Sequence, residues 1–456
     1  MSTISDFIGS SARRNVEAAI AKAHEHESFH ALLSLTEARA LERADAVDRG
    51  EITGRLAGVP FIAKDNFLTL GGTTTAASKF LENFEAPLQA TAIEKLEAEG
   101  AICIGKANLD AFAHGGSTEN SAYGPTKNAV DQERVAGGSS GGSAVAVALS
   151  IVPFALGTDT GGSIRQPASF NGVVGVKPTY GTVSRYGVVA MASSTDTIGV
   201  IATTTHDAAL VMDIMSGQDT KDMTTLADFF TPTVLEGKKK IGVIKEAMTD
   251  DVDADVRRVT NEYIDKLRAD GHVVEEVSLS LLKYALAIYY IVVPAEISSN
   301  LGRYDGIRYG KRADATRLSD VYGASRDQGF MTENKRRIMI GSYVLSSGFF
   351  DAYYLQAQKV RTLLINEFNE LFNSFDVLIA PVAPTPAFRL GENTADPIKM
   401  YLADVMTVPA SLAGLPAISV PAGKSEQGLP IGVQLIGKRR DDALLLALAG
   451  SIEENA

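Results

Sequence analysis

The sequence is poor in cysteine, in long apolar runs and in clustered positive charge. It has one cysteine in 456 residues, Cys103, which excludes an internal disulfide and a metal site built from several cysteines. The apolar runs at 144–157 and 284–295 are shorter than the ~20 residues of a bilayer span, and the N-terminal segment has no apolar signal core. We therefore expect a cytoplasmic protein without a membrane helix.

Basic residues are outnumbered, with 43 Lys and Arg against 55 Asp and Glu and a net charge of −12. Binding to phosphate groups requires clustered Lys and Arg, whereas the basic triplets at 238–240, 335–337 and 438–440 are short and scattered. If a nucleic acid takes part in the function, we expect a partner to hold it. The 45% hydrophobic content is typical of a folded chain with a large core.

Helix and strand patterns alternate along most of the chain. Residues at one helical face recur between the strand-like runs 240–244 and 272–279, namely Val252, Val256, Val259, Tyr263 and Leu267. A helix at 90–99 runs into a strand at 101–105, and the runs 415–423 and 429–437 predict a hairpin. This alternation predicts an α/β fold with a large mixed central β-sheet and helices on both faces.

The first 55 residues have a different character, since they are helical in pattern, charged and rich in Ala and Glu. We interpret residues 1–55 as an N-terminal helical arm packed on the core. Residues 56–456 contain no Pro- or Ser-rich linker, and we expect them to form a single domain. The Gly- and Ser-rich stretch 137–162 encloses an apolar segment, which indicates two tight functional loops rather than a linker.

Two motif matches are better explained by local structure than by a functional site. His26 to His30 spells HExxH, but it lies in the charged arm without a further histidine ligand, so a polar surface is favoured over a zinc site. Gly100 to Lys106 spells GxxxxGK, but its four central residues are apolar and Ala107 replaces the Ser or Thr of a phosphate loop. We predict a strand there.

A third match, GxSxG at 137–141, is the pattern of a serine nucleophile on a sharp turn. That mechanism needs a histidine after the serine, and the sequence offers His206 and His272. His206 falls at a predicted helix N-terminus, and His272 opens a predicted strand. A Ser–His–Asp enzyme is therefore the weaker interpretation.

A lysine and two serines give a stronger pattern. Ser139 and Ser163 lie in the loops GGSSGGS and DTGGSIRQP, and Lys64 ends the apolar run of VPFIAKDN. A serine needs a base to take its proton, and a lysine can serve where burial removes its charge. The glycine-rich turn allows the N–H groups of residues 160–163, namely Thr160, Gly161, Gly162 and Ser163, to converge as an oxyanion hole.

With these segments in this order and spacing, the chain resembles the amidase signature family. The resemblance extends from about residue 56 to 437 and implies the amidase-signature fold with a Ser–cis-Ser–Lys triad. Ser163 would be the nucleophile, Ser139 the relay, held by a non-proline cis peptide, and Lys64 the neutral base. The chain differs from the family pattern at His114, where a Met is expected, and at Val200, where a Pro is usual.

Further segments, at 117–128, 303–310, 335–361 and 401–423, resemble the branch of this family that serves tRNA-dependent amidotransferases. That resemblance implies a glutaminase that supplies ammonia for amidation of Glu-tRNA(Gln), Asp-tRNA(Asn) or both, together with the partner amidotransferase subunits B and C. The larger partner, B, would hold the misacylated tRNA and use ATP and Mg²⁺, and the small partner, C, would bridge the two. No cofactor or metal is implied in this chain.

Free glutamine is a zwitterion, so its pocket should offer a cation and an anion. The resemblance assigns these roles to Arg337 and Asp404, with a tyrosine of the pair Tyr289 and Tyr290. The sequence leaves open which tyrosine contributes, and whether Arg336 or Arg337 does. Two other functions also stay open, a standalone amidase acting on small or aromatic amides and a structural protein of the complex that has lost catalysis.

Overall fold

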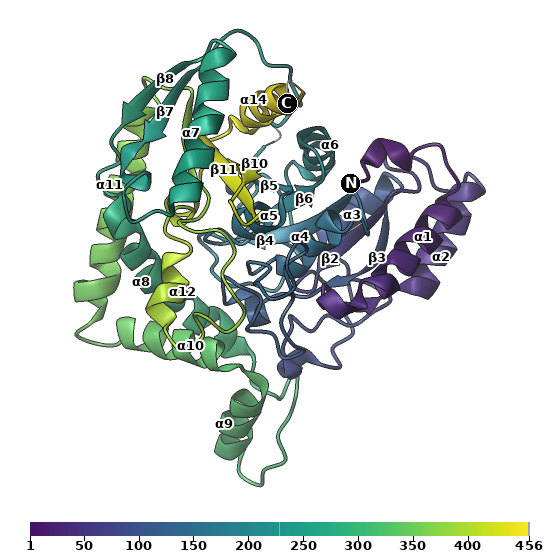
Figure 1. The fold of residues 1–456 in the computed structure, drawn as a ribbon. Helices are drawn as coiled ribbons and strands as arrows, with labels where there is room; N and C mark the ends of the chain where they lie inside the picture. Colours follow the sequence, from purple (N-terminus) through teal and green to yellow (C-terminus); the bar gives the residue numbers. More distant parts are fainter. Residues whose placement is uncertain (228, 455–456) are drawn as a thin grey trace.

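In a computed structural model, which describes residues 1–227 and 229–454, eleven strands form one sheet (Figure 1). They follow the order β1-β3-β2-β4-β6-β5-β10-β11-β9-β7-β8. Their bounds are β1 Leu32–Leu35, β2 Pro60–Lys64, β3 Ile102–Ala107, β4 Phe154–Asp159, β5 Val174–Lys177, β6 Thr197–Ala202, β7 Lys240–Ile244, β8 Val273–Val277, β9 Val377–Pro381, β10 Ala417–Lys424 and β11 Pro430–Gly437. Four pairs are parallel, β2/β3, β2/β4, β7/β8 and β7/β9, and the other six are antiparallel. The predicted mixed sheet is confirmed.

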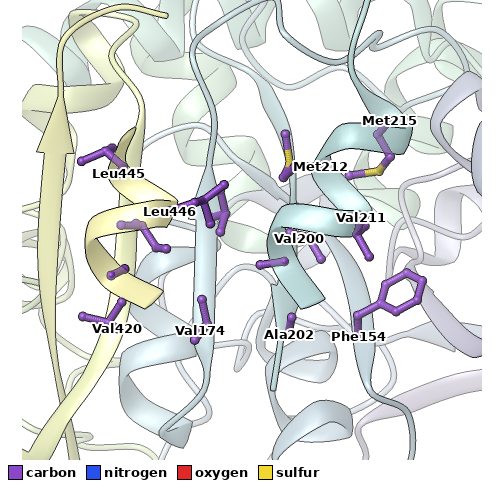
Figure 2. Packing of buried hydrophobic residues seen from close by; sticks show 14 of the residues in the cluster. Phe154, Val174, Val200, Ala202, Val211, Met212, Met215, Val420, Leu445 and Leu446 are labelled. Carbon is purple, nitrogen blue, oxygen red and sulfur yellow. The ribbon is translucent and has the colours of Figure 1, made fainter. Parts of the chain in front are cut away.

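The α-helices of the described residues cover both faces of this sheet. Their bounds are α1 Ala12–Glu25, α2 Glu37–Asp48, α3 Thr91–Ala98, α4 Gly141–Ala148, α5 Arg165–Asn171, α6 Thr205–Met215, α7 Ala254–Ala269, α8 Leu282–Asn300, α9 Leu318–Gly329, α10 Thr332–Val344, α11 Gln356–Leu371, α12 Pro397–Leu402, α13 Val408–Leu412 and α14 Asp442–Glu454. On one face, Met212 of α6 and Leu446 of α14 belong to the same buried cluster as Val200 and Val174 of the sheet (Figure 2). On the other, α4 and α5 pack against Ala155. Phe154 and Ala155 face different helices because side chains alternate along a strand.

The local patterns of the sequence correspond to real elements. Strand β7, helix α7 and strand β8 form the predicted unit, and β7 and β8 pair in parallel. The side chain of Asp253 caps α7 by accepting from the N–H of Asp255, and Gly271 with φ of +87° follows its end. Strands β10 and β11 form the predicted antiparallel hairpin. Hydrophobic periodicity and turn residues were thus sufficient to locate these elements.

The N-terminal arm contains helices α1 and α2 as expected, but also strand β1, which the sequence pattern did not predict. This strand pairs antiparallel with β3 at the edge of the sheet. The division into residues 1–55 and 56–456 stays a prediction. The HExxH match falls outside α1, in and around the 3₁₀ turn Glu27–Phe29, and the GxxxxGK match runs into β3 as expected.

Helix α8 is more apolar than we expected. By length and composition alone, the stretch Leu282–Arg303 could cross a membrane, with a mean hydropathy of 1.2. However, 56% of its most apolar window is buried inside the protein, where Val292 and Val293 pack in the core. We therefore interpret α8 as a core helix. Helix α9 projects from the rest of the molecule below α10 (Figure 1).

The sheet places the candidate residues at one edge. Strands β2 and β4 are parallel neighbours, so their carboxyl ends lie at the same edge of the sheet. Lys64 is the last residue of β2, and Asp159 is the last residue of β4. The Gly- and Ser-rich loops that precede α4 and α5 meet at this edge.

Candidate active site

The side chain of Lys64 is completely buried. Its Nζ donates to the hydroxyl oxygen of Ser139 at 2.7 Å and to that of Thr158 at 2.9 Å. Burial lowers the pKa of Lys64 to about 7, although the carboxylates of Asp110, Asp159 and Asp196 act in the opposite direction. Near neutral pH, a large fraction of Lys64 is therefore uncharged and can accept a proton.

Ser139 lies in a tightly held loop directly before α4. The Gly138–Ser139 peptide bond is cis, which matches the geometry that the resemblance implies. The N–H of Gly138 donates to the side-chain oxygen of Gln166 at 3.0 Å. A side chain on Gly138 would collide with the carboxylate of Asp110 and the backbone of Thr118. Contacts on several sides thus fix the position of the Ser139 hydroxyl.

Ser163 lies in the turn between β4 and α5, and 9% of its surface is exposed. Its carbonyl accepts a hydrogen bond from the N–H of Ser140 at 3.1 Å, which ties the two serine loops together. Its hydroxyl has no hydrogen-bond partner among the described residues. The structure therefore brings Lys64, Ser139 and Ser163 into one site and leaves the third hydroxyl free to act on a ligand.

The turn before Ser163 presents backbone donors. The N–H groups of Gly161, Gly162 and Ser163 donate to no acceptor in the described part of the chain. A Cβ on Gly161 would lie 2.7 Å from the Tyr289 ring, and one on Gly162, with φ of +148°, would meet the hydroxyl of Thr407. The hydroxyl of Thr160, at the start of the turn, donates to Asp196 at 2.8 Å. The turn can therefore serve as an oxyanion hole.

A buried ion pair between Asp159 and Arg165 supports this turn. Arg165 donates to both carboxylate oxygens of Asp159, at 3.0 and 2.9 Å, and neither side chain is exposed. Arg165 also donates to the Thr407 carbonyl at 2.9 Å and to Gln434 at 3.1 Å. Burial acts to raise the pKa of Asp159, but the charge and hydrogen bonds of Arg165 keep it below its ordinary value. Asp159 is therefore ionised at neutral pH, next to the turn.

A cavity of about 330 Å³ adjoins the Ser139 loop, and its lining includes Asp110, His114, Glu333, Arg337 and Tyr401. Arg337 is 3% exposed, and its Nε donates to Glu333 at 2.8 Å. Its guanidinium lies over the rings of Tyr290 and Tyr401, with 5.3 and 5.7 Å to the ring centres. The cavity wall thus carries a fixed positive charge.

The anionic candidate, Asp404, does not line this cavity but lies directly behind Gly116, which does. It accepts from Gln166 at 3.3 Å, and its carboxylate lies against Gly116. Burial raises the pKa of Asp404 to about 7, while Arg337 acts to lower it. Asp404 also precedes Thr407, whose hydroxyl donates to the Gly161 carbonyl at 2.6 Å. This short segment therefore connects the anion to the candidate oxyanion turn.

The members of the two residue pairs that the sequence left open lie in different surroundings, and which of them bind substrate stays a prediction. Arg337 is buried against the tyrosines, whereas the side chain of Arg336 is 39% exposed and pairs with Glu333. Tyr289 contacts Gly161 of the turn, and Tyr290 stacks on Tyr401 with ring centres 3.9 Å apart. Tyr289 is therefore the tyrosine next to the serines, and Tyr290 is the one that supports Arg337.

Several contributors were not identified from the sequence. Thr158 and Gln166 flank the serine turn and could have been noted within the motif itself. Glu333 and Tyr401 carried no signal, because their relation to Arg337 depends on how α10 and α12 pack: Tyr401 donates to Glu333 at 2.9 Å. His206 is exposed, and His272 accepts from the N–H of Lys239. Among the described residues, no group of three His, Cys, Asp or Glu side chains could hold a metal ion.

Comparisons with known proteins show the family of this chain. A profile of the amidase family matches residues 14–446. The A subunit of glutamyl-tRNA(Gln) amidotransferase from Nostoc punctiforme is 51% identical over 436 residues, which are 92% of this chain and 90% of the relative. The corresponding protein of Lactiplantibacillus plantarum is 51% identical over 432 residues, with 93% and 88% covered.

Solved structures show the same fold. The crystal structure of the glutamyl-tRNA(Gln) amidotransferase A subunit from Thermotoga maritima superimposes with a TM-score of 0.84 at 40% identity, and covers 100% of this chain and 95% of that one. A bacterial aryl acylamidase of the amidase signature enzymes superimposes with a TM-score of 0.87 at 26% identity, over 100% and 96% of the two chains. From its profile match, its relatives and its fold, the chain belongs to the amidase family.

Proposed function

We propose that this chain is the glutamine-hydrolysing component of a tRNA-dependent amidotransferase. One observation carries the proposal: the buried amine of Lys64 lies 2.7 Å from the Ser139 hydroxyl, beside a Ser163 hydroxyl that has no partner of its own among the described residues. The 51% identity to amidotransferase A subunits supports glutamine as the substrate. Arg337 and Asp404 are suited to the carboxylate and the ammonium group of a free amino acid.

In the proposed reaction, neutral Lys64 takes the proton of Ser139 while Ser139 takes that of Ser163. The oxygen of Ser163 then bonds to the side-chain amide carbon of glutamine, and the N–H groups of residues 160–163 stabilise the oxyanion. The proton returns from Lys64 through Ser139 to the amide nitrogen, the C–N bond breaks, and ammonia leaves. Water then attacks the γ-glutamyl ester with the same base, which releases glutamate and restores Ser163.

The remaining tasks of the amidotransferase fall to subunits B and C in this proposal. The B protein holds the misacylated tRNA and activates it with ATP and Mg²⁺, and the small C protein bridges B and this chain in the cytoplasm. The net charge of −12 agrees with a chain that does not itself grip tRNA. The choice between Glu-tRNA(Gln) and Asp-tRNA(Asn) then belongs to the partner.

Glutamine hydrolysis, measured as ammonia release with and without subunits B and C, tests the proposal. We expect turnover by the wild type in the complex, stimulation by misacylated tRNA, and no turnover by Ser163→Ala. The aryl acylamidase likeness makes a standalone amidase the specific competitor, so the same protein is assayed on an aromatic anilide. Rapid anilide hydrolysis with no glutamine hydrolysis in the complex would favour the competitor.

A further inference from the structure

His114 carries a hydrogen-bond donor without an acceptor at the cavity beside the serines. Its side chain is completely buried, and its Nε2 has no partner among the described residues. A buried polar atom without a partner is costly, so such an atom at a binding cavity points to a ligand. The residue shares the lining of the cavity with Arg337 and Tyr401.

The neighbouring hydrogen bonds fix the tautomer of the ring. The Asn334 side-chain oxygen accepts from the N–H of Met331 at 3.1 Å, so its amide nitrogen is the donor. That nitrogen donates to the Ala111 carbonyl and to Nδ1 of His114, each at 2.8 Å. Nδ1 is therefore the acceptor, and in the neutral ring the proton resides on Nε2. Burial and the charge of Arg337 keep the pKa of His114 well below its ordinary value, which favours this neutral ring.

The segment that carries His114 is rigid. The Asp110 carboxylate accepts from the N–H groups of Thr118 and Asn120 at 2.9 and 3.0 Å, and Asn120 donates to the His114 carbonyl at 2.9 Å. Two residues further on, Gly116 lies against the Asp404 carboxylate. The segment thus lines the cavity from His114 to Gly116, behind which Asp404 lies, and the ring of His114 is held in place without its Nε2–H being used.

Around Arg337 the local charges leave room for one anion, although the carboxylates of Asp110 and Glu119 also line the cavity. Arg337 donates through Nε to Glu333, and its two Nη groups have no acceptor among the described residues. Glu333 also pairs with Arg336, so the two guanidinium groups and one carboxylate carry a net charge of +1. A carboxylate has two oxygens, which can accept from a guanidinium fork and from one further donor.

We propose that His114 is a specificity-determining residue that donates Nε2–H to the α-carboxylate of the bound substrate, beside the Nη groups of Arg337. This inference rests on the proposed function and adds to it, since it selects amides that carry a free carboxylate over those that do not. A histidine that donates while neutral adds a directed hydrogen bond without a second positive charge.

Paired substrates and paired variants test the proposal. Glutamine is compared with 4-aminobutanamide, which is glutamine without its α-carboxylate. In the complex, His114→Leu should raise KM for glutamine about tenfold and change kcat less than twofold, because a hydrogen bond to a charged group is lost. It should leave kcat/KM for 4-aminobutanamide within twofold, and His114→Gln, which keeps an N–H donor, should recover part of the loss. His206→Gln, at an exposed site, is the control.

Equal losses on the two substrates, or an unchanged KM for glutamine, would overturn the role of His114. Glutamine binding to the Ser163→Ala chain, with and without His114→Leu, is measured by calorimetry in parallel, because it requires no turnover. A tenfold weaker affinity supports the inference even if wild-type glutamine turnover is absent and the proposed function fails. If the Ser163→Ala chain does not bind glutamine, both the substrate and this inference are wrong.

Discussion

The amine of Lys64 is fixed between two hydroxyl groups, those of Ser139 at 2.7 Å and Thr158 at 2.9 Å. Thr158 also accepts from the side chain of Asn66 at 3.2 Å. The contact with Thr158 thereby helps to orient the Lys64 amine toward Ser139. Burial lowers the pKa of Lys64, and these hydrogen bonds orient its amine toward Ser139.

Replacing Thr158 by Val should test the orientation of the Lys64 amine separately from its protonation state. The change keeps the shape of the side chain but removes the oxygen that Lys64 and Asn66 contact. We expect kcat/KM for glutamine to fall by about 10- to 100-fold, because a mispositioned base loses much of a contribution of roughly 10² to 10⁴. Thr260→Val, at a buried threonine of α7, is the matched control and should retain activity. Wild-type kinetics in Thr158→Val would contradict the positioning role.

The pH profile should rise through neutrality. In the proposed mechanism Lys64 acts only when neutral, and its pKa of about 7 means that this form grows as the pH increases. The proposed contact of Asp404 with the ammonium group of the substrate requires the charged carboxylate, and its pKa of about 7 gives a change in the same direction. We expect kcat/KM to increase from pH 5 to 8, with a slope between one and two on the acidic side.

Asp404→Asn should reduce the acidic-side slope of the kcat/KM profile to one and raise KM. In the same variant, kcat should still increase with pH as Lys64 loses its proton. The measurement is initial-rate kinetics in buffers of constant ionic strength. A profile that is flat or that falls between pH 6 and 8 would be incompatible with a neutral lysine base.

A methyl group on the turn should block the oxyanion site. In Gly161→Ala the new Cβ would lie 2.7 Å from the Tyr289 ring, so either the ring or the turn must move. We expect kcat to fall by 10²-fold or more, because the N–H groups lose their alignment with the oxyanion. Gly323→Ala is the control, since a Cβ there has open space and no unfavourable φ. Comparable loss of activity in both variants would indicate a general effect of the substitution.

The ion pair beneath the turn should matter for stability in a pH-dependent way. Arg165→Met leaves the Asp159 carboxylate buried without its partner, and we expect a loss of about 3–5 kcal/mol in the free energy of unfolding at pH 7. The folded-state pKa of Asp159 is depressed, so the stabilisation is present above the unfolded-state pKa and is lost as the pH falls through the folded-state value. The deficit of Arg165→Met should therefore shrink in acid.

Urea denaturation at pH 7 and at pH 3, below the ordinary pKa of an aspartate, measures this effect. Arg13→Met, which breaks exposed pairs with Asp45 and Glu17, is the matched control and should change stability far less than Arg165→Met. The double variant Asp159→Asn with Arg165→Met should be more stable than Arg165→Met alone. A deficit that is independent of pH would show that packing, and not the buried charge, determines the loss.

The fold could be predicted where periodicity was strong. The pattern gave the buried face of α7, because Val256, Val259, Tyr263 and Leu267 are all buried in the structure. Val252 is also buried, but it precedes the helix, which begins at Ala254 after the N-cap Asp253. Strand β1 could not be found in this way, because it has only four residues and lies between two helices. Helix α8 was underestimated because its apolar run is interrupted at Glu296, although the helix continues to Asn300.

Residue type and spacing were enough to select Lys64, Ser139 and Ser163, and the structure places Lys64 against Ser139, while their catalytic roles stay predictions. The partners of these residues could not be predicted, since Gln166 contacts Asp404 across 238 residues of sequence. The choice of Arg337 over Arg336 depends on the rotation of α10, which places one side chain inside and the other at the surface. These contacts depend on how distant segments pack, which cannot be read from a single sequence.

Mass spectrometry of the glutamine reaction, stopped with acid during steady-state turnover, tests the central claim most directly. The account predicts a γ-glutamyl ester on the peptide that contains Ser163 in the wild type, a much lower yield in Lys64→Ala, and none in Ser163→Ala. An ester on Ser139 or a thioester on Cys103, or glutamine turnover that persists in Ser163→Ala, would contradict it.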